Sequence, residues 1–332
     1  MVSAALVGLG WWGTTIARNL EGSTALRLTR AIDTDPARAE WAKARGLAFS
    51  TTLDPALTDP AIDAIILCTP HSQHTAQVAR AAAAGKHVFC EKPLALSRRE
   101  VEASVAACRA AGVVLGVGHE RRFEPPFAAL RRLVDEGELG TLLQIEASFC
   151  QDKFLTLPPG NWRLSSAEAP AGPLTATGIH LLDLAVSLLG PAARVAASLR
   201  RTGSKLANGD TLGALVSFES GANLLLSAIL ATPFAGRLMV YGDKAWVELR
   251  DKAHPESPAG WVLTTCRRDE APVSAEFPPA PSVRNNLEAF ATAAAGGAPY
   301  PIRSDEMIAT AAALEAVIAA VASGKTEPVA AG

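Results

Sequence analysis

The sequence predicts an α/β protein with two domains, and three observations lead to that prediction. The first 120 or so residues alternate short apolar runs with helical patterns, which is typical of a parallel sheet with helices on both faces. From residue 142 onward, apolar and polar residues alternate over several runs, as in a large, mostly antiparallel open sheet facing one layer of helices. The length of 332 residues suits about two domains, so we expect them over 1–120 and 121–332.

The elements of the first domain follow from apolar runs and from helix start and stop signals. Ala64–Cys68 is almost uniformly apolar, as expected for a strand buried on both faces. Ser97 and Glu100 form a capping box that opens a helix. We expect strands at Ala4–Val7, Leu26–Ile32, Ala64–Cys68, His87–Cys90 and Val113–Val117, and helices at Trp12–Leu20, Pro36–Arg45, Gln73–Ala84 and from Ser97 to Ala111.

The second domain is predicted to contain more strand than helix. Gly, Pro, Asn and Asp residues separate its apolar runs and mark the turns. We expect helices at Phe127–Glu136, Val283–Ala295 and Asp305–Ser323, and strands at Leu142–Phe149, Val195–Leu199, Leu212–Phe218, Ala222–Ala228, Arg237–Tyr241, Ala245–Leu249 and Trp261–Cys266.

Composition excludes several classes of protein. The 31 Lys and Arg residues against 33 Asp and Glu give a net charge of 31 − 33 = −2, which argues against nucleic acid or an anionic membrane as a partner. No apolar run reaches the length of a spanning helix. The five cysteines form no CxxC pair, which argues against a disulfide framework or a zinc cage, and we expect no metal. The start of the chain lacks the features of a signal peptide, and we expect a soluble cytoplasmic protein.

A glycine-rich loop follows the first predicted strand. Gly8, Gly10 and Gly13 have the spacing G-x-G-x-x-G, and Asp33 lies twenty residues further on at the end of the second strand. In a dinucleotide-binding Rossmann domain these glycines allow the turn, the approach of the pyrophosphate and close helix packing. Asp33 would bind the ribose hydroxyls and repel a 2′-phosphate, so the sequence favours NAD over NADP.

Two tryptophans and a lysine are further candidates for contact with the cofactor. Trp11 and Trp12 either shield the pyrophosphate or simply pack on the fold. Lys92 follows the strand His87–Cys90, and ligands of open parallel sheets bind beyond the carboxyl ends of the strands. A lysine beside the nicotinamide can polarise a hydroxyl or relay its proton.

With these motifs the sequence resembles the glucose–fructose oxidoreductase, inositol dehydrogenase and MocA (Gfo/Idh/MocA) family over nearly its whole length. The resemblance rests on Gly8–Gly13, Cys68–Pro70 with His74, Gly85–Pro93, Gly118–Phe123, Trp162-Arg163, Gly178–His180 with Asp183, and Tyr241–Glu248. It implies hydride transfer between NAD and a secondary alcohol or ketone of a sugar, inositol or related polyol, in a homodimer or homotetramer.

The resemblance also implies roles for individual residues. Lys92 would be catalytic and would touch the cofactor, and a cis peptide bond is expected between Lys92 and Pro93. His180 would be the second catalytic residue and take the hydroxyl proton. Further cofactor contacts are implied for Thr69, Pro70, His74 and Glu91.

The sequence departs from the family pattern at one catalytic position. Many members have Asp-x-Gly-x-His in the second catalytic stretch, whereas here Ala176 stands where the aspartate would be, four residues before His180. Three interpretations stay open. Lys92 and His180 share proton transfer, helped by the hydroxyl of Thr175 or Thr177; the pocket suits a substrate less polar than a free sugar; or catalysis is lost and the protein is an NAD-binding sensor.

Three further residues are candidates for binding the substrate. Arg122 follows the last predicted strand of the first domain and either contacts substrate or forms an interdomain ion pair. Trp162 and Arg163 lie in a loop rich in Pro and Gly, where an arginine suits a polyhydroxyl or anionic ligand and a tryptophan stacks on a ring; a rim salt bridge is equally compatible with the loop. The substrate could also be a cyclic dihydrodiol-like alcohol, and a cycle that retains NAD and ends in elimination or hydrolysis is a further possibility within the family.

Overall fold

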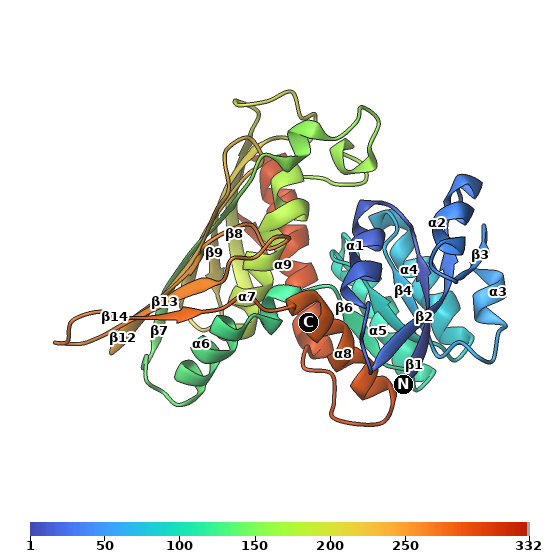
Figure 1. Cartoon of the computed structure of the whole chain (residues 1–332). Helices are drawn as coiled ribbons and strands as arrows, with labels where there is room; N and C mark the ends of the chain where they lie inside the picture. The colour runs from blue at the N-terminus through green and yellow to red at the C-terminus, as the bar shows by residue number, and fades with distance from the viewer. Residues whose placement is uncertain (331–332) are drawn as a thin grey trace. The chain divides into compact units, whose positions relative to one another are not determined.

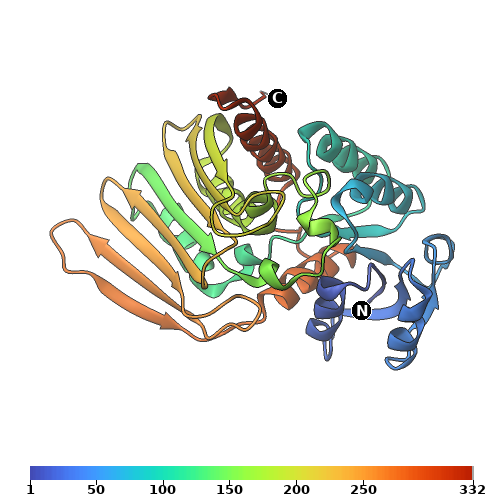
Figure 2. The same cartoon turned by 90° about the horizontal axis from the view of Figure 1, so that it is seen from above.

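The computed structural model describes residues 1–330 and divides into two compact units (Figures 1 and 2). The first unit comprises residues 1–120 and 281–307, and the second comprises 121–280 and the chain from 308 onward. The segment 281–307 was expected in the second domain but belongs to the first unit. Its helical periodicity shows which face is buried, but not the sheet on which that face packs.

The first unit contains a six-stranded parallel sheet in the order β3-β2-β1-β4-β5-β6. The order reverses between β1 and β4, and ligands of such sheets bind in the crevice at that reversal. The expected strands are all present, and the short β3 is an addition. The strands are β1 (Val2–Val7), β2 (Leu26–Ile32), β3 (Ala48–Ser50), β4 (Ala64–Leu67), β5 (His87–Cys90) and β6 (Leu115–Val117).

Helices cover the two faces of this sheet. Helices α4 and α5 pack against each other, and α1 packs with α8. The capping box is confirmed, since Ser97 Oγ accepts a hydrogen bond from Glu100 N and donates one to Glu100 Oε2. Of the predicted helices in this unit, only Pro36–Arg45 is not a single α-helix, because it forms a 3₁₀ turn at Pro36–Arg38 followed by α2. The helices are α1 (Trp11–Asn19), α2 (Ala39–Lys43), α3 (Asp54–Leu57), α4 (His71–Ala83), α5 (Arg98–Ala110) and α8 (Ser282–Ala294).

Helix α8 joins the first unit because it completes the core there. Leu287 and Phe290 are fully buried among residues of β1, β2, β4 and β5. The Phe290 ring meets that of Phe89 edge-on, with 5.6 Å between centroids. Offset and edge-on aromatic pairs of this kind add to the stabilisation from apolar burial.

The second unit is built on a nine-stranded sheet in the order β14-β13-β12-β11-β7-β10-β9-β8-β15. The pair β7–β10 is parallel and the other described neighbours are antiparallel, as the mostly antiparallel prediction requires. β14 and β15 were not foreseen. The strands are β7 (Leu142–Cys150), β8 (Ala192–Arg200), β9 (Thr211–Phe218), β10 (Asn223–Ile229), β11 (Ala235–Gly242), β12 (Ala245–Asp251), β13 (Trp261–Arg267), β14 (Val273–Phe277) and β15 (Glu327–Pro328).

One face of the large sheet is covered by helices α6 (Pro125–Asp135), α7 (Ile179–Leu189) and the greater part of α9 (Ser304–Ser323) (Figure 1). Buried and accessible residues alternate along β9 and β10, as expected for strands with one covered face and one accessible face. Helix α9 is long and apolar enough to cross a membrane, but 56% of its most apolar 18-residue stretch is buried in the protein. That burial accounts for its composition as a core helix.

Candidate functional site

Two glycines of the loop between β1 and α1 are required by the fold itself. Gly8 has φ of +89°, and a Cβ there would lie 2.6 Å from the carbonyl oxygen of Cys68. A Cβ on Gly13 would lie 1.9 Å from the carbonyl oxygen of Gly8. Any larger residue at either position would force β1, α1 and the end of β4 apart.

Gly10 differs from these two because no protein atom explains the absence of its side chain. A Cβ on Gly10 would meet nothing within 4 Å. Gly10 is also the N-cap of α1, and it gives that helix no side-chain cap. A helix N-terminus offers N–H groups and a positive dipole end to a phosphate, and the open space at Gly10 fits its approach. The loop therefore fits the pyrophosphate of a dinucleotide.

Asp33 stands directly after β2 and holds the glycine loop. Its Oδ2 accepts a hydrogen bond from Leu9 N at 2.7 Å, and its Oδ1 accepts one from Asp35 N at 2.9 Å. A carboxylate oxygen has a further lone pair, so ribose hydroxyls can still donate to Asp33. The residue has a structural task that was not foreseen, and its binding of ribose stays a prediction.

The two tryptophans of the loop differ in environment. Trp11 is 42% exposed, whereas Trp12 is half-buried and packs on the core of the first unit. Their rings meet edge-on at 5.6 Å. Trp12 therefore packs on the fold and Trp11 is the more accessible of the two, and the shielding of a bound pyrophosphate stays a prediction.

His74 links the chain after β4 to the chain after β5. It is completely buried, with Nδ1 2.8 Å from the carbonyl oxygen of Pro93 and Nε2 3.0 Å from that of Thr69. This bridging role was not foreseen, and the contact of His74 with the cofactor stays a prediction. Thr69 donates its hydroxyl to Gln77 Oε1 at 2.7 Å, and Pro70 is the N-cap of α4.

The Glu-Lys-Pro turn follows β5, and its Lys92–Pro93 peptide bond is cis, as expected. Glu91 is 7% exposed, and its Oε2 accepts a hydrogen bond from Lys92 N at 3.2 Å. A Cβ on Gly118 would lie 2.5 Å from the Glu91 carboxyl group, so glycine is required there. Lys92 is half-buried. Because β1, β4 and β5 are neighbouring parallel strands, the glycine loop, Thr69 and Lys92 share one edge of the sheet.

In the second unit, the stretch with His180 forms a π-helical turn, Leu174–Gly178, that continues into α7. π-Helical turns are rare in proteins overall, and those that occur often lie at functional sites. His180 is 4% exposed, and its ring centroid lies 6.3 Å from that of Phe149. The Thr177 hydroxyl is buried within 3.1 Å of the carbonyl oxygens of Phe149 and Pro173, and its contact with substrate stays a prediction.

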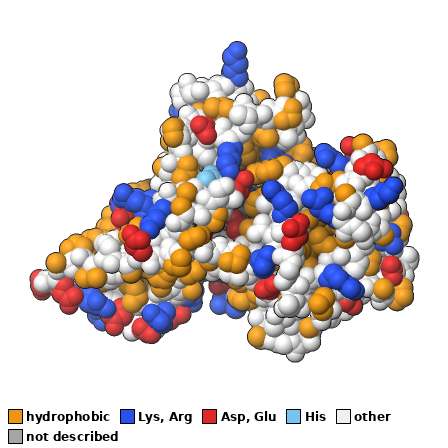
Figure 3. Space-filling view, in the orientation of Figure 1, with side chains coloured by type: hydrophobic (Ala, Val, Ile, Leu, Met, Phe, Trp, Pro, Cys, Tyr) orange, Lys and Arg blue, Asp and Glu red, His pale blue; other side chains and the backbone are white. Residues whose placement is uncertain are grey.

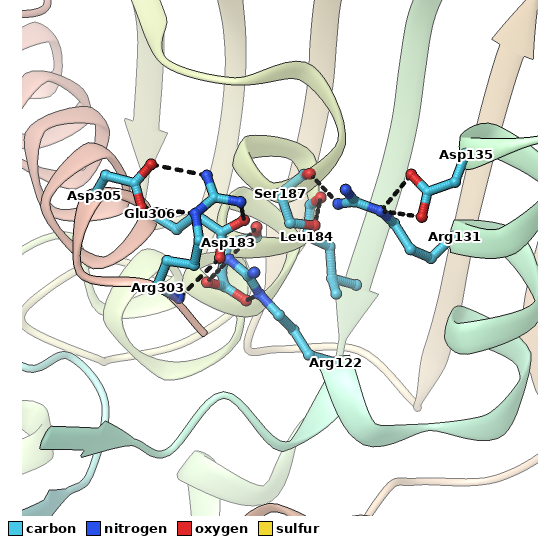
Figure 4. A network of polar contacts seen from close by, with 9 residues as sticks. All are labelled: Arg122, Arg131, Asp135, Asp183, Leu184, Ser187, Arg303, Asp305 and Glu306. Atoms are coloured by element: carbon cyan, nitrogen blue, oxygen red, sulfur yellow. Dashed lines mark hydrogen bonds and ion pairs between the residues drawn. The ribbon is translucent and has the colours of Figure 1, made fainter. Parts of the chain in front are cut away.

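Arg122 forms a buried ion pair with Asp183 (Figure 4). Its Nε and Nη2 donate to the two carboxylate oxygens at 2.7 Å each, a bidentate geometry. Their side chains are 9% and 2% exposed. This pair lies within the second unit and ties the segment before α6 to α7. An interdomain ion pair of Arg122 and its contact with substrate both stay predictions. The same figure shows Arg131 bonded to Asp135 and to the Ser187 carbonyl.

Trp162 and Arg163 form a 3₁₀ turn with Leu164. The Arg163 guanidinium stacks 4.2 Å from the Trp162 ring centroid, and its backbone N donates to Asn161 Oδ1. Asn208 anchors the turn by donating to the Arg163 carbonyl. Both side chains are half-buried, and their contact with substrate stays a prediction.

Two polar side chains near Phe149, those of Arg121 and His254, were not singled out from the sequence. Arg121 donates to Asp251 at 2.7 and 2.8 Å and pairs with Glu124 at 3.2 Å, and its guanidinium lies 5.2 Å from the Phe149 ring centroid. Burial raises the pKa of Glu124 to about 7, although Arg121 opposes it. The His-Glu-Arg-Arg-Phe run carries both arginines, but nothing in its letters shows which carboxylate each one meets.

His254 is the second missed group. Its ring packs on Phe149 with 6.0 Å between centroids, and its Nε2 lies 2.6 Å from Gln151 Oε1. The Nδ1 atom is 3.0 Å from Lys153 Nζ, and burial together with Lys153 lowers the pKa of His254 to about 4. The imidazole is therefore neutral at pH 7.

Among residues 1–330, no group of three or more His, Cys, Asp or Glu side chains is placed to hold a metal ion.

Comparison with known proteins agrees with this geometry. Residues 2–119 match the oxidoreductase family with an NAD-binding Rossmann fold, and residues 127–248 match the GFO/IDH/MocA C-terminal domain. The chain belongs to the Gfo/Idh/MocA family. It is therefore an NAD-dependent oxidoreductase, and the first unit is its NAD-binding domain.

Similar Gfo/Idh/MocA proteins cover nearly the whole chain. The 1,5-anhydro-D-fructose reductase of Ensifer adhaerens is 31% identical over 89% of this chain and 88% of its own. The inositol 2-dehydrogenase of Rhizobium meliloti is 27% identical over 97% of each. A putative NADPH-dependent oxidoreductase of Desulfitobacterium hafniense has a solved structure with a TM-score of 0.88 and 25% identity, over 99% of this chain and 97% of its own.

Proposed function

We propose that the protein transfers a hydride between NAD and a secondary alcohol or ketone of a sugar, inositol or related polyol. The observation that carries the proposal is the placement of Lys92 on the same sheet edge as the glycine loop, two strands from β1. Relatives over nearly the full length are named for inositol and an anhydro-sugar, which favours a ring polyol.

Lys92 and His180 are the residues proposed to handle the proton. Oxidation of the alcohol moves the carbinol hydrogen as a hydride to the nicotinamide, and the hydroxyl proton goes to a base as the C=O bond forms. Lys92 would bind and polarise the substrate oxygen, and His180 would accept its proton. With alanine at position 176, neither residue has the family's usual carboxylate at that position.

Turnover of a panel of alcohols tests this proposal. The panel contains cyclic polyols, aldoses, sugar acids and cyclic dihydrodiols, with NADH absorbance as the readout. Lys92→Met and His180→Gln should each lower kcat by about a hundredfold or more. Lys43→Met, at an exposed position of α2, is the matched control and should leave turnover unchanged. Full activity in Lys92→Met would refute its role.

Three alternative functions are distinguishable in the same experiment. Oxidation of dihydrodiols without polyols would favour a non-sugar cyclic alcohol as substrate. NAD that copurifies tightly, with net elimination or hydrolysis, would favour a retained-cofactor cycle. NADH binding without turnover of any alcohol would favour a sensor.

We infer a preference for NAD over NADP from Asp33. Its carboxylate, after β2, would face a 2′-phosphate with a like charge. The Desulfitobacterium structure is named as NADPH-dependent, so both cofactors need to be tested. A kcat/KM for NAD at least about tenfold above that for NADP is expected, and a preference for NADP would refute the assignment.

We also propose a cytoplasmic homodimer or homotetramer that acts on a small molecule and binds neither nucleic acid nor membrane. Leu225 of β10 faces outward at 42% exposure beside the equally exposed Leu215, and an exposed apolar pair of this kind suits a subunit interface. On the face drawn in Figure 3, basic and acidic side chains are interspersed, unlike a nucleic-acid-binding surface. Light scattering of the wild type and of Leu225→Arg tests the assembly, since the variant should be monomeric.

A further inference from the structure

Ala176, at the position where many family members have aspartate, is the one accessible residue in an otherwise buried segment. Every residue from 171 to 187 is buried except Ala176, which is half-buried. Ala176 lies in the π-helical turn and precedes His180 by four residues. A ligand that reaches this part of the chain therefore meets Ala176 before any of its neighbours in the segment.

The surroundings of Ala176 are apolar. It packs on a cluster formed by Phe154, Leu206 and Leu230, together with the partly buried Leu157 and Leu164. An aspartate here would place its charge against alkyl and aromatic carbons, at a considerable desolvation cost. The apolar residues around Ala176 come from three connecting segments, which follow β7, β8 and β10.

A pocket of about 470 Å³ continues from this cluster. This volume lies within the usual range for small-molecule sites, roughly 300–1,000 Å³. Four residues of the cluster line it, and its polar side chains are those of Asn161, Ser165 and Lys205. The four shared residues are Phe154, Leu157, Leu164 and Leu206. The pocket lined by these four residues is hereafter called the apolar pocket.

We propose that the substrate is a ring alcohol with an apolar substituent, such as an aryl or alkyl aglycone, and that the apolar pocket binds that substituent. The inference rests on the proposed function and specifies its substrate class. The chemistry is unchanged by it: the carbinol C–H bond breaks to give a hydride to NAD, the hydroxyl proton goes to the base, and a C=O bond forms. The apolar substituent takes no part in the reaction and supplies binding.

Matched glycosides test the apolar pocket. Phenyl and methyl β-D-glucopyranoside share the same ring hydroxyls and differ only in the apolar group. We expect the phenyl compound to have a kcat/KM at least about tenfold higher, mainly through KM, since a phenyl ring gains from burial in an apolar pocket. Leu157→Asp should bring the ratio of the two kcat/KM values close to one. Val273→Asp, at an exposed position on β14, is the control and should keep the ratio.

A second variant guards against misfolding of the first. Ala176→Asp restores the family's carboxylate and should also lower the phenyl-to-methyl ratio, while thermal unfolding shows that each variant is folded. Equal kcat/KM values for the two glycosides in the wild type would overturn the apolar pocket and leave the proposed function standing.

Absence of turnover with every ring alcohol, with normal NADH binding, would instead overturn the proposed function. Calorimetric titration of phenyl glucoside into NADH-loaded protein would then decide the apolar pocket alone. Binding that Leu157→Asp abolishes would support it, and no binding to the wild type would overturn it.

Discussion

Replacement of Gly10 by alanine separates the demands of the fold from the demands of the cofactor. A Cβ at Gly8 or Gly13 would approach backbone atoms to 2.6 or 1.9 Å, whereas a Cβ at Gly10 would meet no protein atom within 4 Å. Gly10 also has an ordinary φ of −66°. The Gly10→Ala variant should therefore fold, and its defect should appear only when a dinucleotide approaches the loop.

The expected magnitudes follow from this geometry. Loss of glycine's freedom in the unfolded chain stabilises by about 0.4–1 kcal/mol, and alanine is a poorer N-cap than glycine. These effects oppose each other, so the free energy of unfolding should change by less than about 1 kcal/mol. Gly13→Ala should cost about 3 kcal/mol or more, because an oxygen must move by more than an ångström. For NADH, Gly10→Ala should raise Kd at least about tenfold, or about 1.4 kcal/mol.

Urea unfolding and NADH fluorescence titration measure the two effects separately. Gly213→Ala is the matched control, since a Cβ there also meets no atom within 4 Å, but the residue lies on β9 of the second unit. That variant should keep both stability and NADH affinity. An unchanged Kd in a folded Gly10→Ala protein would refute the assignment of this loop to the pyrophosphate.

Three further perturbations test single groups. Arg122→Met leaves the Asp183 carboxylate without its bidentate partner and should lower the free energy of unfolding by about 3 kcal/mol in urea; a loss below about 1 kcal/mol would contradict a structural role. Asp33→Asn removes the charge, so the ratio of kcat/KM for NAD to that for NADP should fall severalfold, and an unchanged ratio would argue against ribose recognition. His254 has its pKa lowered to about 4, so the unfolded state binds more protons between about pH 4 and 6.5, and stability should fall as the pH drops through that window by up to about 3 kcal/mol. His254→Gln should flatten that part of the profile, and an unchanged slope would show that other groups cause it.

The first sheet was well predicted from the sequence because its signals are local. Leu26–Ile32 and His87–Cys90 form strands with the predicted bounds, and the Ser97 cap opens its helix as expected. The four-residue α3 and the edge strand β14 were missed, since short or exposed elements leave little apolar periodicity.

The candidate site divides in the same way. Gly8, Gly10 and Gly13 could be picked out as a candidate phosphate loop from their spacing, because such a loop uses contiguous chain, and Asp33 from its place at the end of the second strand. Spacing did not show that, of the three loop glycines, Gly10 has open space at its Cβ position, or that Asp33 also accepts a hydrogen bond from Leu9 N.

By itself, the sequence determined the longer strands and helices of the first sheet, the glycine loop, the Glu-Lys-Pro turn and the alanine at position 176. Only the tertiary structure decided the partners of the buried polar groups: Asp183 for Arg122, two backbone carbonyls for His74, and the Phe149 and Pro173 carbonyls for Thr177. It also placed α8 with the first sheet and packed Ala176 on a cluster of which four residues line a pocket. The physical reason is that local patterns record which face of a segment is buried, whereas hydrogen-bond partners and pockets come from segments that are distant in the chain.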